Sequence, residues 1–181
     1  SSAAVYGNPS DMPLTEESAV DPLSPYGISK NVGELYCGKW KELYGLDTVS
    51  LRFSNVYGPR QGTTGEGGVL SIFIQRALKN CELVVFGDGN QTRDFIFVGD
   101  IAEAVYGIAS SSACGIFNLS TNIENSVNGL IDILSRIHPL RAVRYTDPRS
   151  GDIKFSRLDN SKIASVLGWK PACSFEEGVR R

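Results

Sequence analysis

The stretch "SPYGISKNVGELYCGKWKELYGLDTVSLRFSNV", residues 24–56, joins a helix pattern directly to a strand pattern. Ser24 before Pro25 is typical of an N-cap followed by proline at the first helical position. Apolar side chains then recur at helical spacing until Gly45, at Ile28, Val32, Leu35, Tyr36, Trp40 and Leu43. From residue 47 to 56 apolar and polar residues alternate, which predicts a strand.

The same alternation of helix and strand patterns continues along the chain. Strands are predicted at 81–87, 92–98, 115–120 and 142–148, and helices at 67–80, 100–111, 126–137 and 160–168. Asp100 and Ser126 are the expected N-caps of two of these helices, and Gly168 is the expected stop of a third. Ser174 predicts the cap of one more helix at the end of the sequence. This order predicts an α/β fold with a largely parallel sheet.

Composition narrows the classes of function. The 181 residues suit one large domain or two small ones, and the net charge of −2 without a Lys/Arg run argues against nucleic acid as a partner. No apolar stretch is long enough to span a membrane and no signal peptide is visible, so we expect a cytoplasmic protein. The four cysteines are scattered, and His138 is the sole histidine, so no metal site is expected.

Tyr26 and Lys30 lie four residues apart and therefore share a helix face. A phenol has a pKa of about 10 and is a poor base near neutrality. A nearby ammonium lowers that pKa, and a tyrosine so tuned can exchange a proton with a sugar hydroxyl. Ser1 or Ser2, in "SSAAVYG", offers a second hydroxyl. Alone, the Y-x-x-x-K spacing is also common in exposed surface pairs.

Several motifs occur in one order along the chain. They are "SSAAVYG", "SPYGISK", "LRFSNVYGPRQ", "GDGNQTRDFIFVGD", "SGD" and "LGWKP". This series resembles the extended short-chain dehydrogenase/reductase family, specifically the nucleotide-sugar 4-epimerases, over nearly the whole chain. The resemblance implies the C-terminal part of a Rossmann-type parallel sheet plus a smaller α/β substrate-binding domain.

The resemblance also implies a division of the chain. Residues 1–60 would be the remainder of an NAD-binding Rossmann domain that carries the catalytic helix. Residues 61–181 would mainly bind the sugar nucleotide, with about 99–121 returning to the Rossmann sheet.

The resemblance assigns roles to individual residues. Tyr26 would be the acid/base, Lys30 would bind the nicotinamide ribose and tune Tyr26, and Ser2 would hydrogen-bond the reacting hydroxyl. Tyr26, Lys30 and Phe53 would contact NAD.

The residues that the resemblance assigns to the substrate are Asn55, Phe86, Arg93, Arg149, Asp152 and Ser156. Asn55 and the two arginines would hold the diphosphate, Phe86 would lie against the base, and Asp152 would take the ribose hydroxyls. Ser156 would lie beside the C2 substituent of the sugar and, being small, would admit an N-acetyl group. Each residue also has a local explanation: Arg93, for example, is placed to pair with Asp94.

A glycine-rich stretch, "GTTGEGG" at 62–68, matches G-x-x-G-x-x-G, and Asp88 follows Gly68 at the distance of a ribose-binding acid. We do not expect it to bind NAD, because "VYGPRQ" separates it from its strand and it follows the Tyr-Lys helix. Residue 1 is Ser, and the predicted terminal helix begins as the sequence stops. We therefore expect an excerpt that lacks the phosphate-binding turn.

The function implied by the resemblance is NAD-dependent 4-epimerisation of a UDP-sugar through a 4-keto intermediate. The whole protein would be a homodimer, and this excerpt alone would be inactive. A rival function is that of a nucleotide-sugar 4,6-dehydratase, but that branch usually carries Thr-Asp-Glu where this chain has Ser2-Ala3-Ala4. Two further rivals are a UDP-glucuronate decarboxylase and a non-catalytic nucleotide-sugar binding module.

Overall fold

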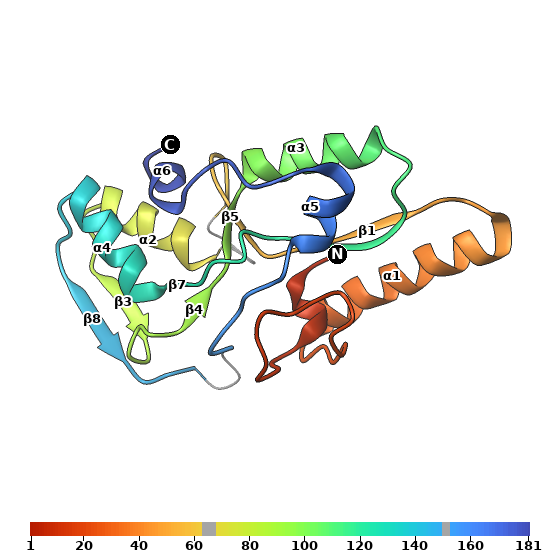
Figure 1. Ribbon diagram of the computed structural model, residues 1–181. Helices are drawn as coiled ribbons and strands as arrows, with labels where there is room; N and C mark the ends of the chain where they lie inside the picture. The colour runs from red at the N-terminus through yellow and green to blue at the C-terminus, as the bar shows by residue number, and fades with distance from the viewer. Residues whose placement is uncertain (63–67, 150–152) are drawn as a thin grey trace.

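The computed structural model describes residues 1–62, 68–149 and 153–181 (Figure 1). The strands are β1 (Val49–Phe53), β2 (Asn55–Tyr57), β3 (Leu83–Phe86), β4 (Thr92–Arg93), β5 (Phe95–Phe97), β6 (Gly115–Leu119), β7 (Asn125–Ser126) and β8 (Val143–Thr146). The helices are α1 (Pro25–Tyr44), α2 (Val69–Leu78), α3 (Val98–Ala109), α4 (Val127–Ile137), α5 (Ser161–Leu167) and α6 (Phe175–Arg180). A 3-10 turn, η1 (Ala3–Tyr6), precedes them.

Strand pairing in the described residues confirms an α/β fold with parallel strands. The pairs β1–β6, β2–β5 and β3–β8 are parallel, and the short pair β4–β7 is antiparallel. Each parallel pair joins segments that are far apart in sequence, as expected where helices cross between strands. Because each sheet has two strands, contacts outside the sheets must hold the pairs together.

Local signals for helix ends are confirmed at most positions. The side chains of Ser24, Ser126 and Ser174 each accept a hydrogen bond from the backbone N–H three residues on, as N-caps do. Gly45 and Gly168 adopt left-handed φ angles of 67° and 64° and end α1 and α5.

The prediction that Asp100 caps a helix is wrong. The strand predicted at 92–98 divides into β4 and β5, and α3 begins at Val98, so Asp100 lies within the first helical turn. Its buried carboxylate instead accepts hydrogen bonds from the backbone N–H groups of Ala172 and Cys173, both at 3.2 Å. The Asp100 carboxylate, which the sequence suggested as a helix cap, therefore binds a segment about 70 residues away in the sequence.

Two main apolar clusters divide the packing. One gathers side chains of α2, α4, β3 and β5, at the end of the molecule where β8 forms the edge (Figure 1). The other packs α3 and α5 against β1 and β6. A smaller cluster of Val5, Tyr6, Leu14 and Leu158 joins the start of the chain to a segment near its end. The division of the chain near residue 60 stays a prediction.

Helix α1 forms as predicted, but its apolar stripe is exposed in the described structure. Leu35 and Tyr36 are each 62% exposed, whereas the preceding residue, Glu34, is only 7% exposed. Glu34 is buried because it forms an ion pair with Arg52 of β1, in which both side chains are almost fully buried. The strand's polar residues Ser50 and Arg52 are thus more buried than its apolar ones.

The Arg52–Glu34 pair is two-pronged and extends into a network. Arg52 Nε donates to Glu34 Oε1 at 2.9 Å, and Nη2 donates to Oε2 at 2.7 Å. Arg52 Nη1 donates to the Tyr6 hydroxyl at 2.9 Å, which donates to Asn118 Oδ1 at 2.7 Å. Burial alone would raise the pKa of Glu34, but hydrogen bonds from Arg52 and the Ser1 hydroxyl outweigh it and hold that pKa below its ordinary value.

Glu34→Gln is expected to lower the free energy of unfolding by about 3–5 kcal/mol, because it leaves the buried Arg52 charge uncompensated. Glu42→Gln is the matched control, since Glu42 forms an exposed pair with Lys39 in the same helix and should cost less than about 1 kcal/mol. Urea unfolding of both variants at neutral pH measures the difference. Equal effects would contradict the buried network.

The lowered pKa of Glu34 also fixes the sign of a pH dependence. The pair's contribution is fully present above the ordinary value of 4.5 and is lost as pH falls through the lower folded-state value. The free energy of unfolding of the native chain should therefore drop more steeply below about pH 4.5 than that of Glu34→Gln. Parallel pH profiles of the two proteins would contradict a lowered pKa of Glu34.

Candidate functional site

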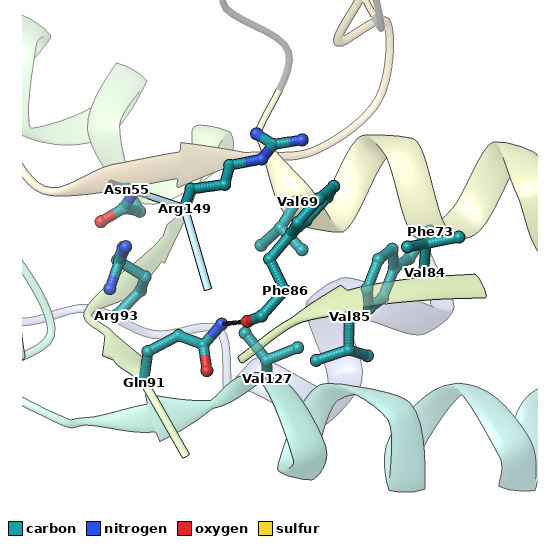
Figure 2. A pocket seen from close by; sticks show the side chains of 10 residues that line it. All are labelled: Asn55, Val69, Phe73, Val84, Val85, Phe86, Gln91, Arg93, Val127 and Arg149. Carbon is teal, nitrogen blue, oxygen red and sulfur yellow. Dashed lines mark hydrogen bonds between the residues drawn. The ribbon is translucent and has the colours of Figure 1, made fainter. Parts of the chain in front are cut away.

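A cavity of about 480 Å³ lies where η1, the first turn of α1, the β1–β2 segment, β4 and residues 153–156 meet. Its lining includes predicted site residues from all of these segments: Ser2, Tyr26, Phe53, Asn55, Arg93 and Ser156. An adjacent cavity of about 220 Å³ is lined by Phe86 and Arg149, and shares Asn55 and Arg93 with the first (Figure 2). Asn55 and Arg93 therefore lie at the junction of the two cavities.

Tyr26 and Lys30 share a face of α1, as their spacing predicts. Lys30 Nζ lies 5.1 Å from the centroid of the Tyr26 ring, and Tyr26 is 38% exposed. The first turn of α1 approaches η1 closely at Gly27, where a Cβ atom would lie 2.6 Å from the Ala4 carbonyl oxygen. This contact brings Tyr26 to the cavity wall that also carries Ser2.

The two candidate serines have different surroundings. The Ser1 hydroxyl donates to Glu34 and is part of the buried ion-pair network. Ser2 forms an isolated parallel bridge with Phe53, and its hydroxyl oxygen accepts the Ala4 N–H at 3.2 Å. Among the contacts of the described residues, the Ser2 hydroxyl hydrogen has no acceptor, so it can be donated to a molecule in the cavity.

The smaller cavity combines an aromatic face with guanidinium groups. The Arg149 guanidinium lies 3.8 Å from the centroid of the Phe86 ring, and Figure 2 shows the Arg149 side chain extended above that ring. Gln91 Nε2 donates to the Phe86 carbonyl at 2.8 Å and fixes the end of β3. The structure thus brings Phe86 and Arg149 together. Asp152, the predicted ribose ligand, lies outside the described residues.

Asp94 is a buried residue that the sequence did not single out as part of the site. Its carboxylate accepts hydrogen bonds from Thr121 N at 2.9 Å and Thr121 Oγ1 at 2.7 Å. It also accepts from Asn122 N at 3.0 Å and Leu158 N at 3.3 Å. Burial raises the pKa of Asp94, and these hydrogen bonds act in the opposite direction.

The Asp94 cluster holds the wall of the cavity in place. The Asp94 backbone carbonyl accepts the Asn55 N–H at 2.9 Å, and Leu158 is two residues from Ser156. Arg93 precedes Asp94 in the chain. Asp94 therefore fixes three segments that contribute side chains to the site. In the sequence Asp94 stands between Arg93 and the apolar run of residues 95–98, and nothing in that order indicates its partners.

No helix among the described residues is both long and apolar enough to cross a membrane. In the same part of the chain, no group of three or more His, Cys, Asp or Glu side chains is placed to hold a metal ion. The cavities are lined instead by hydroxyls, amides, arginines and aromatic rings, which are groups that bind polar organic ligands.

Asp94→Asn is expected to lower the free energy of unfolding by at least about 2 kcal/mol, because an amide nitrogen would face backbone N–H donors that lose a charged acceptor. Asp132→Asn, on the exposed face of α4, is the matched control and should change stability by less than about 0.5 kcal/mol. Both are measured by urea unfolding. If Asp94→Asn were as stable as the control, the hydrogen bonds of the Asp94 cluster would not contribute to the stability of the fold.

Comparisons with known proteins agree along the whole chain. The sequence profile of one family, described as GDP-mannose 4,6 dehydratase, matches residues 1–181. A Methanocaldococcus jannaschii protein, provisionally named a UDP-glucose 4-epimerase, is 47% identical over 182 residues, which are 100% of this chain and 59% of that protein.

Solved structures of nucleotide-sugar epimerases also match nearly the whole chain. The UDP-N-acetylglucosamine 4-epimerase from Methanobrevibacter ruminantium M1, in complex with UDP-N-acetylmuramic acid, matches with a TM-score of 0.94 and 40% identity over 99% of this chain and 59% of its own. The Thermus thermophilus UDP-glucose 4-epimerase, in complex with NAD, matches with a TM-score of 0.88 and 36% identity over 99% of this chain and 60% of its own. The chain thus spans about 59% of the length of its relatives.

Proposed function

This chain belongs to the GDP-mannose 4,6 dehydratase family, within the extended short-chain dehydrogenase/reductases, and on that premise we propose that it is the substrate-binding part of an NAD-dependent UDP-sugar 4-epimerase. The observation that carries the proposal is the pair of adjacent cavities, which share two lining residues. Tyr26 and Ser2 line one, Phe86 and Arg149 line the other, and Asn55 and Arg93 lie between them.

The smaller cavity suits a nucleotide. Arg93 and Arg149 present guanidinium groups, which match phosphate oxygens with paired N–H donors. The ring of Phe86 offers an apolar face to a base, provided that Arg149 moves from its place over that ring. Asn55, between the cavities, is placed to donate to the diphosphate. Asp152 would take the ribose hydroxyls.

The larger cavity suits the sugar. Tyr26 would accept the proton of the sugar 4-hydroxyl, Lys30 would stabilise the phenolate, and Ser2 would donate to the same oxygen. The 4-keto sugar would turn over in the cavity so that hydride returns to the opposite face of C4, and Tyr26 would give the proton back to the C4 oxygen. Ser156, buried and small, would leave room for an N-acetyl group at C2.

The residues beside Tyr26 fit the ribose end of NAD. An ammonium and a phenol, at Lys30 and Tyr26, are suitable donors for a ribose diol, and Phe53 lines the same wall. When bound, NAD supplies the hydride acceptor for sugar C4. We assign residues 1–60 to the NAD-binding part and 61–181 mainly to the sugar-nucleotide part. The exposed apolar stripe of α1 supports a homodimer of the whole protein.

An epimerase is favoured over the dehydratase for which the family is named. Loss of water requires an acid and a base in addition to the tyrosine, and carboxyl groups usually supply them. Among the described residues that line the larger cavity there is no Asp or Glu, and Ala3 and Ala4 occupy the positions next to Ser2. Epimerisation needs no acid or base beyond Tyr26, because Tyr26 would both take the proton of the 4-hydroxyl and return it.

Arg93→Ala and Arg149→Ala should each weaken UDP binding by roughly 1.5–3 kcal/mol, which is the scale of a hydrogen bond to a charged group. Arg141→Ala is the control, because Arg141 is exposed and lines neither cavity. Calorimetric titration of the chain with UDP measures the effect. Affinities that match the Arg141→Ala value in both variants would place the diphosphate elsewhere.

Tyr26→Phe in the whole protein should abolish turnover of UDP-galactose and leave UDP binding unchanged, because the ring is preserved and the proton carrier is lost. Tyr36→Phe, on the exposed stripe of the same helix, is the control and should retain full turnover. Rates are measured by coupled detection of UDP-glucose. Near-normal turnover of Tyr26→Phe would remove Tyr26 from the mechanism.

A further inference from the structure

We infer that Arg149 makes the smaller cavity select nucleotides against free nucleosides, because its guanidinium occupies the ring of Phe86 until a phosphate group draws it away. The inference rests on the proposed function and adds to it a means of distinguishing ligands that share one base. It is drawn from a contact between two described residues, Arg149 and Phe86.

The Arg149 guanidinium and a base stacked on the same face of Phe86 would need the same space. The guanidinium carbon lies 3.8 Å from the centroid of the ring, and Figure 2 shows the Arg149 side chain extended above that ring. Atoms in van der Waals contact are separated by about 3.5–4.0 Å, so the guanidinium lies at the height that a stacked base would take. The contact with Arg149 and base stacking on that face therefore exclude one another.

Arg149 also lies where two cavities meet. The smaller cavity and a third one, of about 510 Å³, share the lining residues Phe86, Gln91 and Arg149. Gln91 is held by its hydrogen bond to the Phe86 carbonyl, whereas Arg149 is exposed and lies in the irregular segment after β8. Displacement of the Arg149 side chain would join the spaces on either side of it and uncover the Phe86 ring.

A nucleoside would have to displace Arg149 without compensation. The cation–π contact with Phe86 would be lost, and a neutral nucleoside carries no charge to receive the guanidinium. A ligand that binds only the displaced state has its apparent affinity lowered by the fraction of protein in that state. The native site should therefore bind uridine more weakly than the same site without the guanidinium.

A nucleoside diphosphate would compensate for the displacement. A cation–π contact uses no hydrogen-bond acceptor, so the N–H donors of Arg149 remain available to phosphate oxygens. Arg93 and Asn55 line the same cavity and mark where the diphosphate would lie. A charge-assisted hydrogen bond to phosphate is stronger than an exposed cation–π contact. The phosphates would thus draw Arg149 from Phe86, and the base would take its place.

Titration of the whole protein with uridine and with UDP, followed by NMR, tests the inference through two effects of opposite sign. Arg149→Ala should bind uridine about two- to five-fold more tightly than the native protein, which is the scale of an exposed cation–π contact. The same variant should bind UDP more weakly. Arg141→Ala, which is exposed and lines neither of these two cavities, should leave both affinities unchanged.

Uridine binding by Arg149→Ala that is equal to or weaker than that of the native protein, or undetectable in both, would overturn the inference. Tighter uridine binding without weaker UDP binding would overturn it as well, because the phosphate would then not receive Arg149. Failure of UDP to bind the native protein would overturn the proposed function instead. The failures are distinguishable because uridine lacks the phosphates.

The contact can also be observed directly in the free protein. A proton above an aromatic ring resonates upfield of its ordinary position. The Arg149 Nε–H signal, identified by its absence in Arg149→Ala, should therefore move downfield in Phe86→Leu. Saturating UDP should move it in the same direction in the native protein. A signal whose position is unaffected by Phe86→Leu would overturn the inference, because the guanidinium would not lie on that ring in solution.

Discussion

The buried carboxylate of Asp94 is the constraint on which the arrangement of the site depends. The described sheets have only two strands each, so their own hydrogen bonds cannot fix one pair against another. The Asp94 carboxylate does so by accepting hydrogen bonds from the backbone N–H groups of Thr121, two residues after β6, and of Leu158, while the Asp94 carbonyl accepts the Asn55 N–H. One carboxylate thereby aligns the segments that carry Asn55, Arg93 and Ser156.

The Arg52–Glu34 pair performs the corresponding task for helix α1. Burying two charges carries a desolvation cost that attraction offsets only when geometry is good and the remaining donors are satisfied. Here the pair is two-pronged, and Tyr6 and Asn118 extend it to η1 and β6. Helix α1 is thus anchored by its polar residue, which explains how its apolar stripe is exposed while Tyr26 still faces the cavity.

Local features of the fold were predictable because neighbouring residues decide them. The caps at Ser24 and Ser126 and the shared face of Tyr26 and Lys30 follow from spacing alone, and the structure confirms them. Asp100 and Asp94 were not predictable, because their partners lie tens of residues away in the sequence. The site residues came from motif order. The structure places most of them on the walls of two adjacent cavities, and their chemical roles remain proposals.

The most direct measurement of the central claim is incubation of the whole protein with UDP-galactose in D2O, followed by proton NMR of the sugar. A 4-epimerase that moves one hydride between C4 and its cofactor yields UDP-glucose with hydrogen retained at C4 and no deuterium on any carbon. A 4-keto-6-deoxy product carrying solvent deuterium would contradict the account, and so would the absence of any conversion by protein that contains NAD.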